Sequence, residues 1–207
     1  MKGKFITFEG CEGVGKSRQL QMLGEYLDKN NVKHYFTREP GGEPISEKIR
    51  NIILDKENIE MTAECGALLY ASSRAQLLNR VIAPKLAEGT LVICDRYLDS
   101  SFSYQAYARG LGVEFVSSIN HFAIKNFMPD YTIFLNLSPE QAFKRKGGVD
   151  ASDRLELSGM EFHNKVYQGY LQLAKDNPQR FIVIDASGDK FQTHQKIISA
   201  LKQKGVI

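Results

Sequence analysis

The sequence from Gly10 to Ser17 has the residue types and the spacing of a loop that binds phosphate groups. It fits the pattern of a glycine, four residues, a second glycine, a lysine and a serine or threonine. Glycines let backbone N–H groups surround an anion, the lysine reaches the β- and γ-phosphates, and the serine hydroxyl binds a magnesium ion. The expected ATP-binding residues are Gly10, Cys11, Glu12, Gly13, Val14, Gly15, Lys16 and Ser17.

The residues on either side of this loop supply the structural context that the motif requires. Residues 4–9 form an apolar run of strand length, and residues 18–27 carry apolar side chains at positions 20, 23 and 27. The latter spacing places those side chains on one face of a helix. Because phosphate-binding loops lie between a strand and a helix, this context favours a binding loop over a chance glycine-rich turn.

A second group with metal and phosphate chemistry follows the apolar run 90–95. Asp95 ends this expected strand, and Arg96 comes directly after it. A carboxylate at this place holds a magnesium ion or its water shell, and an arginine donates two N–H groups to a phosphate. A structural ion pair between Asp95 and Arg96 is the alternative.

Short apolar runs alternate with helical patterns along the whole chain. This alternation predicts an α/β fold in which a parallel sheet is covered by helices on both faces. Ligands of such folds bind beyond the carboxyl ends of the strands. The length of 207 residues fits one domain, residues 1–207. The expected strands are 4–9, 33–37, 90–95, 131–137 and 181–185, and the expected helices include 45–54, 62–80 and 115–127.

Four side chains between the second and third expected strands are candidates for substrate binding. Arg38 precedes a turn rich in proline and glycine, and Arg50 lies in the helix 45–54. Tyr70 and Arg74 are four residues apart and share a helix face, where a ring stacks on a base and a guanidinium donates to its carbonyl oxygens. The pattern alone leaves alternatives: a surface charge for Arg50 and Arg74, and core packing for Tyr70.

Three later segments also have the composition of nucleotide-binding segments. Residues 99–105 combine hydroxyls, aromatic rings and an amide, which suits a nucleoside. Residues 143–156 are basic and contain glycine, so we expect a mobile lid that closes over phosphates and compensates their charge. An exposed flexible loop is the alternative for this lid. Residues 186–189 form a small-residue loop at the edge where a purine ring is expected.

Composition and charge exclude several classes of protein. The chain is 43% hydrophobic and 25% charged, as in ordinary globular proteins, and its net charge of +3 requires no nucleic-acid partner. Cys11, Cys65 and Cys94 lack metal-ligand spacing and fit a reducing compartment. No apolar run approaches the ~20 residues of a membrane span, and the N-terminus lacks a signal-peptide core. These features predict a cytoplasmic protein with no membrane partner.

Three sequence blocks together resemble the thymidylate kinases of bacteria. They are Phe-Glu-Gly-Cys-Glu-Gly at 8–13, Thr-Arg-Glu-Pro-Gly-Gly at 37–42, and Asp-Arg-Tyr at 95–97 followed by Ser100, Ser101, Tyr104 and Gln105. The resemblance extends over almost the whole chain. It implies a P-loop NTPase fold with a five-stranded parallel sheet, and a homodimer. It also implies phosphorylation of dTMP to dTDP by ATP and Mg²⁺, a step in the synthesis of dTTP.

The resemblance further implies roles for individual residues. Arg38 and Arg96 grip the acceptor phosphate, Tyr70 stacks on thymine, and Tyr104 lies against the deoxyribose. The implied dTMP-binding residues are Glu12, Arg38, Arg50, Tyr70, Arg74, Arg96, Ser101, Tyr104 and Gln105. The implied metal site consists of Ser17, Asp95 and Glu9, where Glu9 supports the metal region. The implied catalytic residues are Lys16, Arg96, Arg145, Arg154 and Glu12.

One departure from the family pattern concerns the catalytic cation. Some thymidylate kinases carry an arginine inside the phosphate-binding loop, which this sequence lacks, so the basic residues of the lid must supply that charge. Arg145, Lys146 and Arg154 are the candidates, whereas positions that are often arginine are Gly147 and Val149 here.

Two other functions remain as alternatives. One is another nucleoside or nucleotide kinase of the same fold. The other is a GTP-binding switch, which is less well supported because the run 164–167, Asn-Lys-Val-Tyr, lacks the aspartate of a guanine-reading motif.

Overall fold

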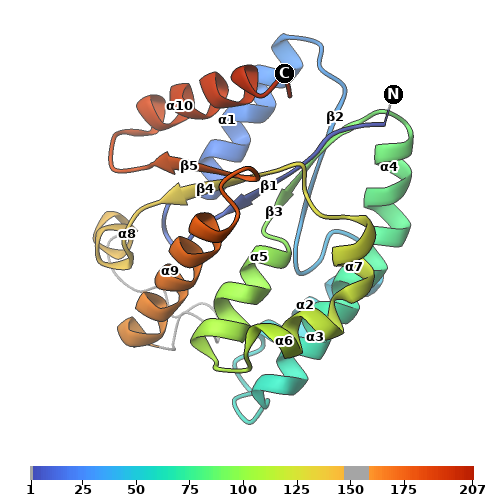
Figure 1. Ribbon diagram of the computed structural model, residues 1–207, viewed down its shortest axis with the longest axis vertical. Coiled ribbons are helices and arrows are strands. Elements are labelled where there is room, and N and C mark those ends of the chain that lie inside the picture. Colours follow the sequence, from blue (N-terminus) through green and yellow to red (C-terminus); the bar gives the residue numbers. More distant parts are fainter. Residues whose placement is uncertain (1, 147–158) are drawn as a thin grey trace.

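A computed structural model describes residues 2–146 and 159–207 of the chain (Figure 1). The central sheet has five parallel strands, as predicted, and their order is β2-β3-β1-β4-β5. Each strand begins or ends within one residue of the expected position. The strands are β1 (Phe5–Glu9), β2 (His34–Arg38), β3 (Leu91–Asp95), β4 (Tyr131–Asn136) and β5 (Phe181–Asp185).

Helices cover both faces of the sheet and make a three-layer α/β/α arrangement (Figure 1). Helix α1 packs beside α10 on one face, whereas α9 packs against the segment after β3 on the other. The helices are α1 (Lys16–Lys29), α2 (Pro44–Leu54), α3 (Ala63–Leu77), α4 (Ala83–Ala87), α5 (Leu98–Ser101), α6 (Val113–Ile119), α7 (His121–Asn126), α8 (Pro139–Lys146), α9 (Gly159–Asp176) and α10 (Lys190–Gln203). Two π-helical segments are Leu78–Ile82 and Phe102–Ala108.

The central strand β1 is buried along its whole length, which fixes the middle of the sheet. Near its end, Phe8 pairs with Asp95 at the end of β3. On the other side of β3, Arg38 at the end of β2 also pairs with Asp95. Since all strands are parallel, their polar last residues meet at one edge of the sheet. This edge carries the site described below.

Four details of the helices differ from the expectations. The helix expected at 115–127 is interrupted at Asn120, whose backbone leaves the helical region. The helix expected at 62–80 changes at Leu78 into a π-helical turn. Leu68, expected on its apolar face, is 49% exposed. Residues 99–105, read only as a polar and aromatic stretch, form α5 and the π-helical segment Phe102–Ala108.

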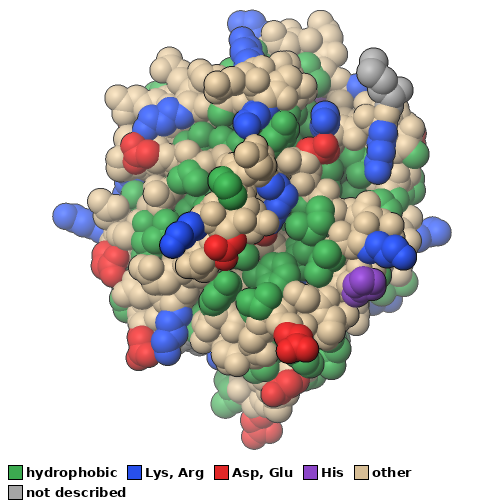
Figure 2. Space-filling model, in the orientation of Figure 1, with side chains coloured by type: hydrophobic (Ala, Val, Ile, Leu, Met, Phe, Trp, Pro, Cys, Tyr) green, Lys and Arg blue, Asp and Glu red, His purple; other side chains and the backbone are tan. Residues whose placement is uncertain are grey.

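The surface agrees with the modest net charge. On the face seen in Figure 2, the Lys and Arg side chains are interspersed with Asp and Glu, so no continuous basic stripe covers this face. Within residues 2–146 and 159–207, no helix has the length and hydropathy needed to cross a bilayer.

Candidate active site

A cavity of about 500 Å³ opens at the carboxyl edge of the sheet. Its wall combines residues of the phosphate-binding loop with residues that follow β2 and β3 and with the buried face of α3. Most of the predicted site residues meet there. They are Glu12, Gly13, Gly15, Lys16, Ser17, Arg38, Arg50, Tyr70, Arg74, Asp95, Arg96, Ser101, Tyr104 and Gln105.

The phosphate-binding loop turns tightly between β1 and α1. Gly10 and Gly13 have positive φ angles of 147° and 76°. A Cβ atom at Gly13 would lie 3.1 Å from the backbone oxygen of Ala142, so this turn requires glycine. Lys16 is buried at the start of α1, and burial together with Arg96 lowers the pKa of its ammonium group. Burial raises the pKa of the Cys11 thiol to about 12, so it stays neutral.

Arg96 lines the cavity and has an unusual backbone conformation. Its φ is 66°, a left-handed value that costs a non-glycine residue roughly 1–3 kcal/mol and is often found at functional sites. Its guanidinium donates to Glu12, to the backbone oxygen of Gly10 at 3.0 Å and to the Tyr170 hydroxyl at 3.2 Å. The surrounding structure therefore holds this side chain over the phosphate-binding loop.

The carboxyl group of Glu12 is ionised beside this arginine. Burial acts to raise the pKa of Glu12, but Arg96 and Lys16 outweigh it and lower the pKa to about 2. The Tyr104 hydroxyl also donates to Glu12, over 3.3 Å. The ion pair predicted to be possible between Asp95 and Arg96 is instead made by Glu12.

Glu9 lies behind this layer and does not line the cavity. It is fully buried, and its carboxylate accepts hydrogen bonds from the Tyr97 backbone N–H at 2.8 Å, the Ser100 hydroxyl at 2.6 Å and the Tyr170 hydroxyl at 2.7 Å. Burial raises the pKa of Glu9 to about 7. The contacts of Glu9 anchor the chain around Arg96.

Asp95 and Ser17 have the chemistry of a magnesium site. Both line the cavity, and Oδ1 of Asp95 is a buried oxygen with no hydrogen-bond partner among the residues that the structure describes. Those residues contain no cluster of three or more His, Cys, Asp or Glu side chains that would enclose a metal. A carboxylate, a hydroxyl and the oxygens of bound phosphates match the open sites in which Mg²⁺ is usually held.

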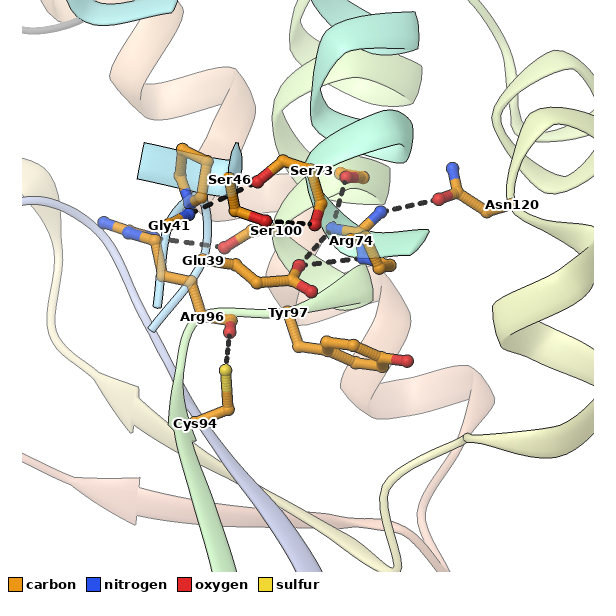
Figure 3. Close-up of polar contacts among 12 residues, drawn as sticks. Glu39, Gly41, Ser46, Ser73, Arg74, Cys94, Arg96, Tyr97, Ser100 and Asn120 are labelled. Carbon is orange, nitrogen blue, oxygen red and sulfur yellow. Dashed lines mark hydrogen bonds and ion pairs between the residues drawn. The ribbon is translucent and has the colours of Figure 1, made fainter. Parts of the chain in front are cut away.

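Three arginines, at the end of β2 and in helices α2 and α3, differ in their exposure and in their polar partners. Arg38 is half exposed and forms an ion pair of 2.9 Å with Glu47. Arg50 donates to the backbone oxygen of Pro40 at 2.8 Å. Arg74, by contrast, is buried in a network of polar contacts (Figure 3). The surface position considered for Arg74 is therefore wrong.

The predicted catalytic residue Arg145 does not line this cavity. Arg145 donates to the backbone oxygen of Ala186 at 2.6 Å and to that of Ser187, and it lines a second cavity of about 480 Å³ beside Gly13 and Val14. The structure thus places it at the small-residue loop after β5. Arg154, like residues 147–156 of the expected lid, lies outside the described residues.

Among the residues that sequence reasoning missed, two hold the guanidinium of Arg74. Glu39 forms the ion pair with Arg74, and Asn120 accepts a hydrogen bond from the same guanidinium. Glu39 lies inside the Thr-Arg-Glu-Pro block, so its position near the site was predictable from the sequence. Its ion pair with Arg74 was not. No signal in the sequence joined Asn120 to α3, because 46 residues separate it from Arg74.

Comparisons with known proteins agree with this geometry. A family model described as thymidylate kinase matches residues 8–197. The chain is 47% identical to the thymidylate kinase of Caldanaerobacter subterraneus subsp. tengcongensis over 203 residues, which cover 98% of this chain and 97% of that protein. It is 46% identical to the thymidylate kinase of Bacillus velezensis over 205 residues, which cover 98% of this chain and 97% of that protein. The chain therefore belongs to the thymidylate kinase family.

Proposed function

We propose that this chain transfers the terminal phosphoryl group of ATP to dTMP and releases ADP and dTDP, as a step toward dTTP. Family membership supports the two substrates. The observation that carries the proposal is the position of Arg96. Its guanidinium donates to the Gly10 backbone oxygen of the phosphate-binding loop, and Arg96 lines the same cavity as Tyr70 and Arg74.

The reaction needs alignment and charge compensation more than covalent chemistry from the protein. An oxygen of the acceptor phosphate is the nucleophile, so no side chain has to attack. Lys16 and the backbone N–H groups of the loop hold the donor phosphates, and Arg96 with Arg38 holds the acceptor phosphate. Each cation reduces the repulsion between two anions that must approach within bonding distance.

The other end of the cavity suits a pyrimidine deoxynucleoside. Tyr70 offers a ring for stacking on the base, while Arg74, Ser101 and Gln105 offer polar atoms to its edge. Tyr104 lies against the sugar, and Glu12 accepts a hydrogen bond from the 3′-hydroxyl. Arg50 lines the phosphate end of the same pocket.

Mg²⁺ fits the pair formed by Ser17 and Asp95, with Glu9 supporting the region from behind. Bound there, it would neutralise charge on the β- and γ-phosphates. The unpartnered Oδ1 of Asp95 supports this assignment. Removing the ion with a chelator should abolish turnover, and adding Mg²⁺ should restore it.

The two basic residues near the lid take separate roles in this proposal. Arg145 belongs to the adenine side, because its guanidinium lies against Ala186 and Ser187. Arg154 is assigned, from the family resemblance alone, to the transferring phosphoryl group. A variant lacking Arg154 should lose kcat, whereas one lacking Arg145 should lose affinity for ATP.

We also propose that each chain folds as a single domain, that two chains form a homodimer, and that the protein is cytoplasmic. Ile45 and Ile52 on α2 and Leu68 on α3 are large apolar side chains that are about half exposed, and these two helices pack together. Such side chains are typical of a surface that a second copy covers. Sedimentation velocity would test the dimer, and Leu68→Glu should shift it toward monomer.

The proposed function is tested by measuring ADP release with a panel of acceptors. dTMP should give the highest kcat/KM, and thymidine, AMP and dCMP should give little turnover. Lys16→Ala should reduce turnover with dTMP by at least 100-fold. A preference for AMP, dCMP or thymidine would identify another kinase of the same fold and would contradict the proposal.

A further inference from the structure

A buried ion pair lies at the base end of the cavity, between Glu39 and Arg74 (Figure 3). Arg74 is 1% exposed and Glu39 is 4% exposed, yet both line the cavity. Oε2 of Glu39 accepts a hydrogen bond from Nε of Arg74 at 2.8 Å and lies 2.7 Å from Nη2 as an ion pair. The carboxylate therefore contacts two nitrogen atoms on one side of the guanidinium.

Two further contacts hold the same guanidinium from other segments. Nη1 of Arg74 donates to Oδ1 of Asn120 at 2.6 Å, and Nη2 donates to the Ser101 hydroxyl at 3.0 Å. The ring of Tyr97 lies 5.2 Å from the guanidinium carbon. The α3 side chain is thus fixed by the loop after β2, by α5 and by the junction of α6 and α7, so its plane cannot rotate freely.

The contacts of Arg74 leave an N–H group that a ligand can use. A guanidinium has five N–H groups and no acceptor. Three of them form hydrogen bonds: Nε–H with Glu39, one on Nη2 with Ser101 and one on Nη1 with Asn120. Nη2 is also in ion-pair contact with Glu39, so among the described residues the second N–H of Nη1 is the group left without a partner. Because it only donates, it favours a ring edge that carries a carbonyl oxygen over one that carries an amino group.

The pair is poorly explained as a device for stability. Oε1 of Glu39 is buried and has no partner among the described residues. An unsatisfied buried oxygen costs roughly 1–3 kcal/mol, and buried ion pairs are often no more stable than apolar replacements. A carboxylate kept in this position is better explained by what it does to Arg74.

We propose that Glu39 is a positioning residue for substrate selection: it orients Arg74 so that an N–H group of Nη1 meets the 4-carbonyl oxygen of a pyrimidine and disfavours a 4-amino group. The inference rests on the proposed function, because it assumes that the base of the acceptor occupies this end of the cavity. Glu39 acts through Arg74 and need not touch the base.

The test is the variant Glu39→Gln, which keeps the size of the side chain and removes its charge. Values of kcat and KM are measured for dTMP, dUMP and dCMP, with KM for ATP as an internal reference. We expect kcat/KM for dTMP and dUMP to fall at least 10-fold, the preference for dTMP over dCMP to shrink by a similar factor, and KM for ATP to stay unchanged. Glu88→Gln, which breaks an exposed ion pair with Lys85, is the matched control and should leave all these values as in the wild type.

A second variant covers the case in which Glu39→Gln does not fold. Asn120→Ala removes another hydrogen-bond partner of the same guanidinium without leaving an unpaired buried charge. It should also reduce the preference for dTMP over dCMP. The inference is overturned if a folded variant melts earlier but keeps the wild-type KM for dTMP and the wild-type ratio of dTMP to dCMP. A wild-type protein inactive on dTMP would instead overturn the proposed function.

Discussion

The carboxylate of Glu12 forms an ion pair with the guanidinium of Arg96, although the two residues are 84 positions apart in the sequence. Glu12 comes from the loop expected to hold ATP, and Arg96 follows the strand that carries the expected metal ligand Asp95. The pair therefore joins the donor half of the cavity to the acceptor half. Each of the two side chains compensates the charge of the other.

This relationship gives a prediction for Glu12→Gln. If Glu12 accepts a hydrogen bond from the 3′-hydroxyl of dTMP, the variant should raise KM for dTMP by about 10-fold, since a hydrogen bond to a charged group contributes roughly 1.5–3 kcal/mol. The penalty should largely disappear when the acceptor is 3′-deoxy-dTMP. An equal penalty with both acceptors would show that Glu12 acts on Arg96 alone.

Arg145→Ala should separate donor binding from transfer. Its guanidinium contacts the backbone oxygens of Ala186 and Ser187, outside the cavity that contains Arg96. We therefore expect KM for ATP to rise several-fold while KM for dTMP and the single-turnover rate at saturating ATP change little. A large loss of the single-turnover rate with normal KM for ATP would return Arg145 to the catalytic role predicted from the sequence.

The stability of the protein should decrease between pH 5 and pH 7 partly because of Glu39. Burial, opposed by Arg74, raises the pKa of Glu39 from 4.5 to about 7. Between these values the folded chain keeps a proton that the unfolded chain releases, so this contribution is complete below pH 4.5 and lost as the pH rises through 7. Its size is on the order of 3 kcal/mol. Urea unfolding of Glu39→Gln at pH 5.5 and 7.5 should show a smaller difference than the wild type, and equal differences would contradict this assignment.

The buried Asp99 and the partly buried Arg180 form an ion pair that supports the sheet rather than the cavity. Arg180 donates to Oδ2 of Asp99 at 2.5 Å and to Oδ1 at 2.8 Å, and Thr132 on β4 donates to Oδ2 at 2.8 Å. Asp99→Ala leaves an unpaired cation, so the free energy of unfolding should fall by about 3–5 kcal/mol.

The matched control for that variant is Glu161→Ala. Glu161 pairs with Lys165 on the exposed face of α9, where solvent screens the ion pair and its contribution to stability is small. Chemical denaturation of both variants would compare them directly. A loss below 1 kcal/mol for Asp99→Ala would show that the buried pair does not support the sheet as described.

The strands and the phosphate-binding loop were predictable because their signals are local. Five apolar runs bounded by turns define the sheet, and the glycine spacing defines the loop between β1 and α1. The resemblance placed Tyr70 and Arg74 at the base end, and both line the cavity. These features need only neighbouring residues to be recognised.

Contacts between distant residues were not predictable in the same way. Glu39 and Asn120 meet at Arg74 only after three separate segments pack together. The break at Asn120 follows from that packing, since its side chain serves Arg74 and the backbone oxygen of Val116. Likewise, basic composition placed Arg145 among the cations of the transfer site, whereas its backbone partners after β5 depend on the tertiary structure.

The central claim is that ATP and dTMP meet end to end in one cavity, with Lys16 and Arg96 between them. The most direct measurement is inhibition by a single molecule that joins adenosine and thymidine through five phosphates. It should compete with both ATP and dTMP and bind far more tightly than either, because one molecule fills both halves of the site. Lys16→Ala and Arg96→Ala should each weaken its binding by at least 10-fold. Competition with only one of the two nucleotides would contradict the claim.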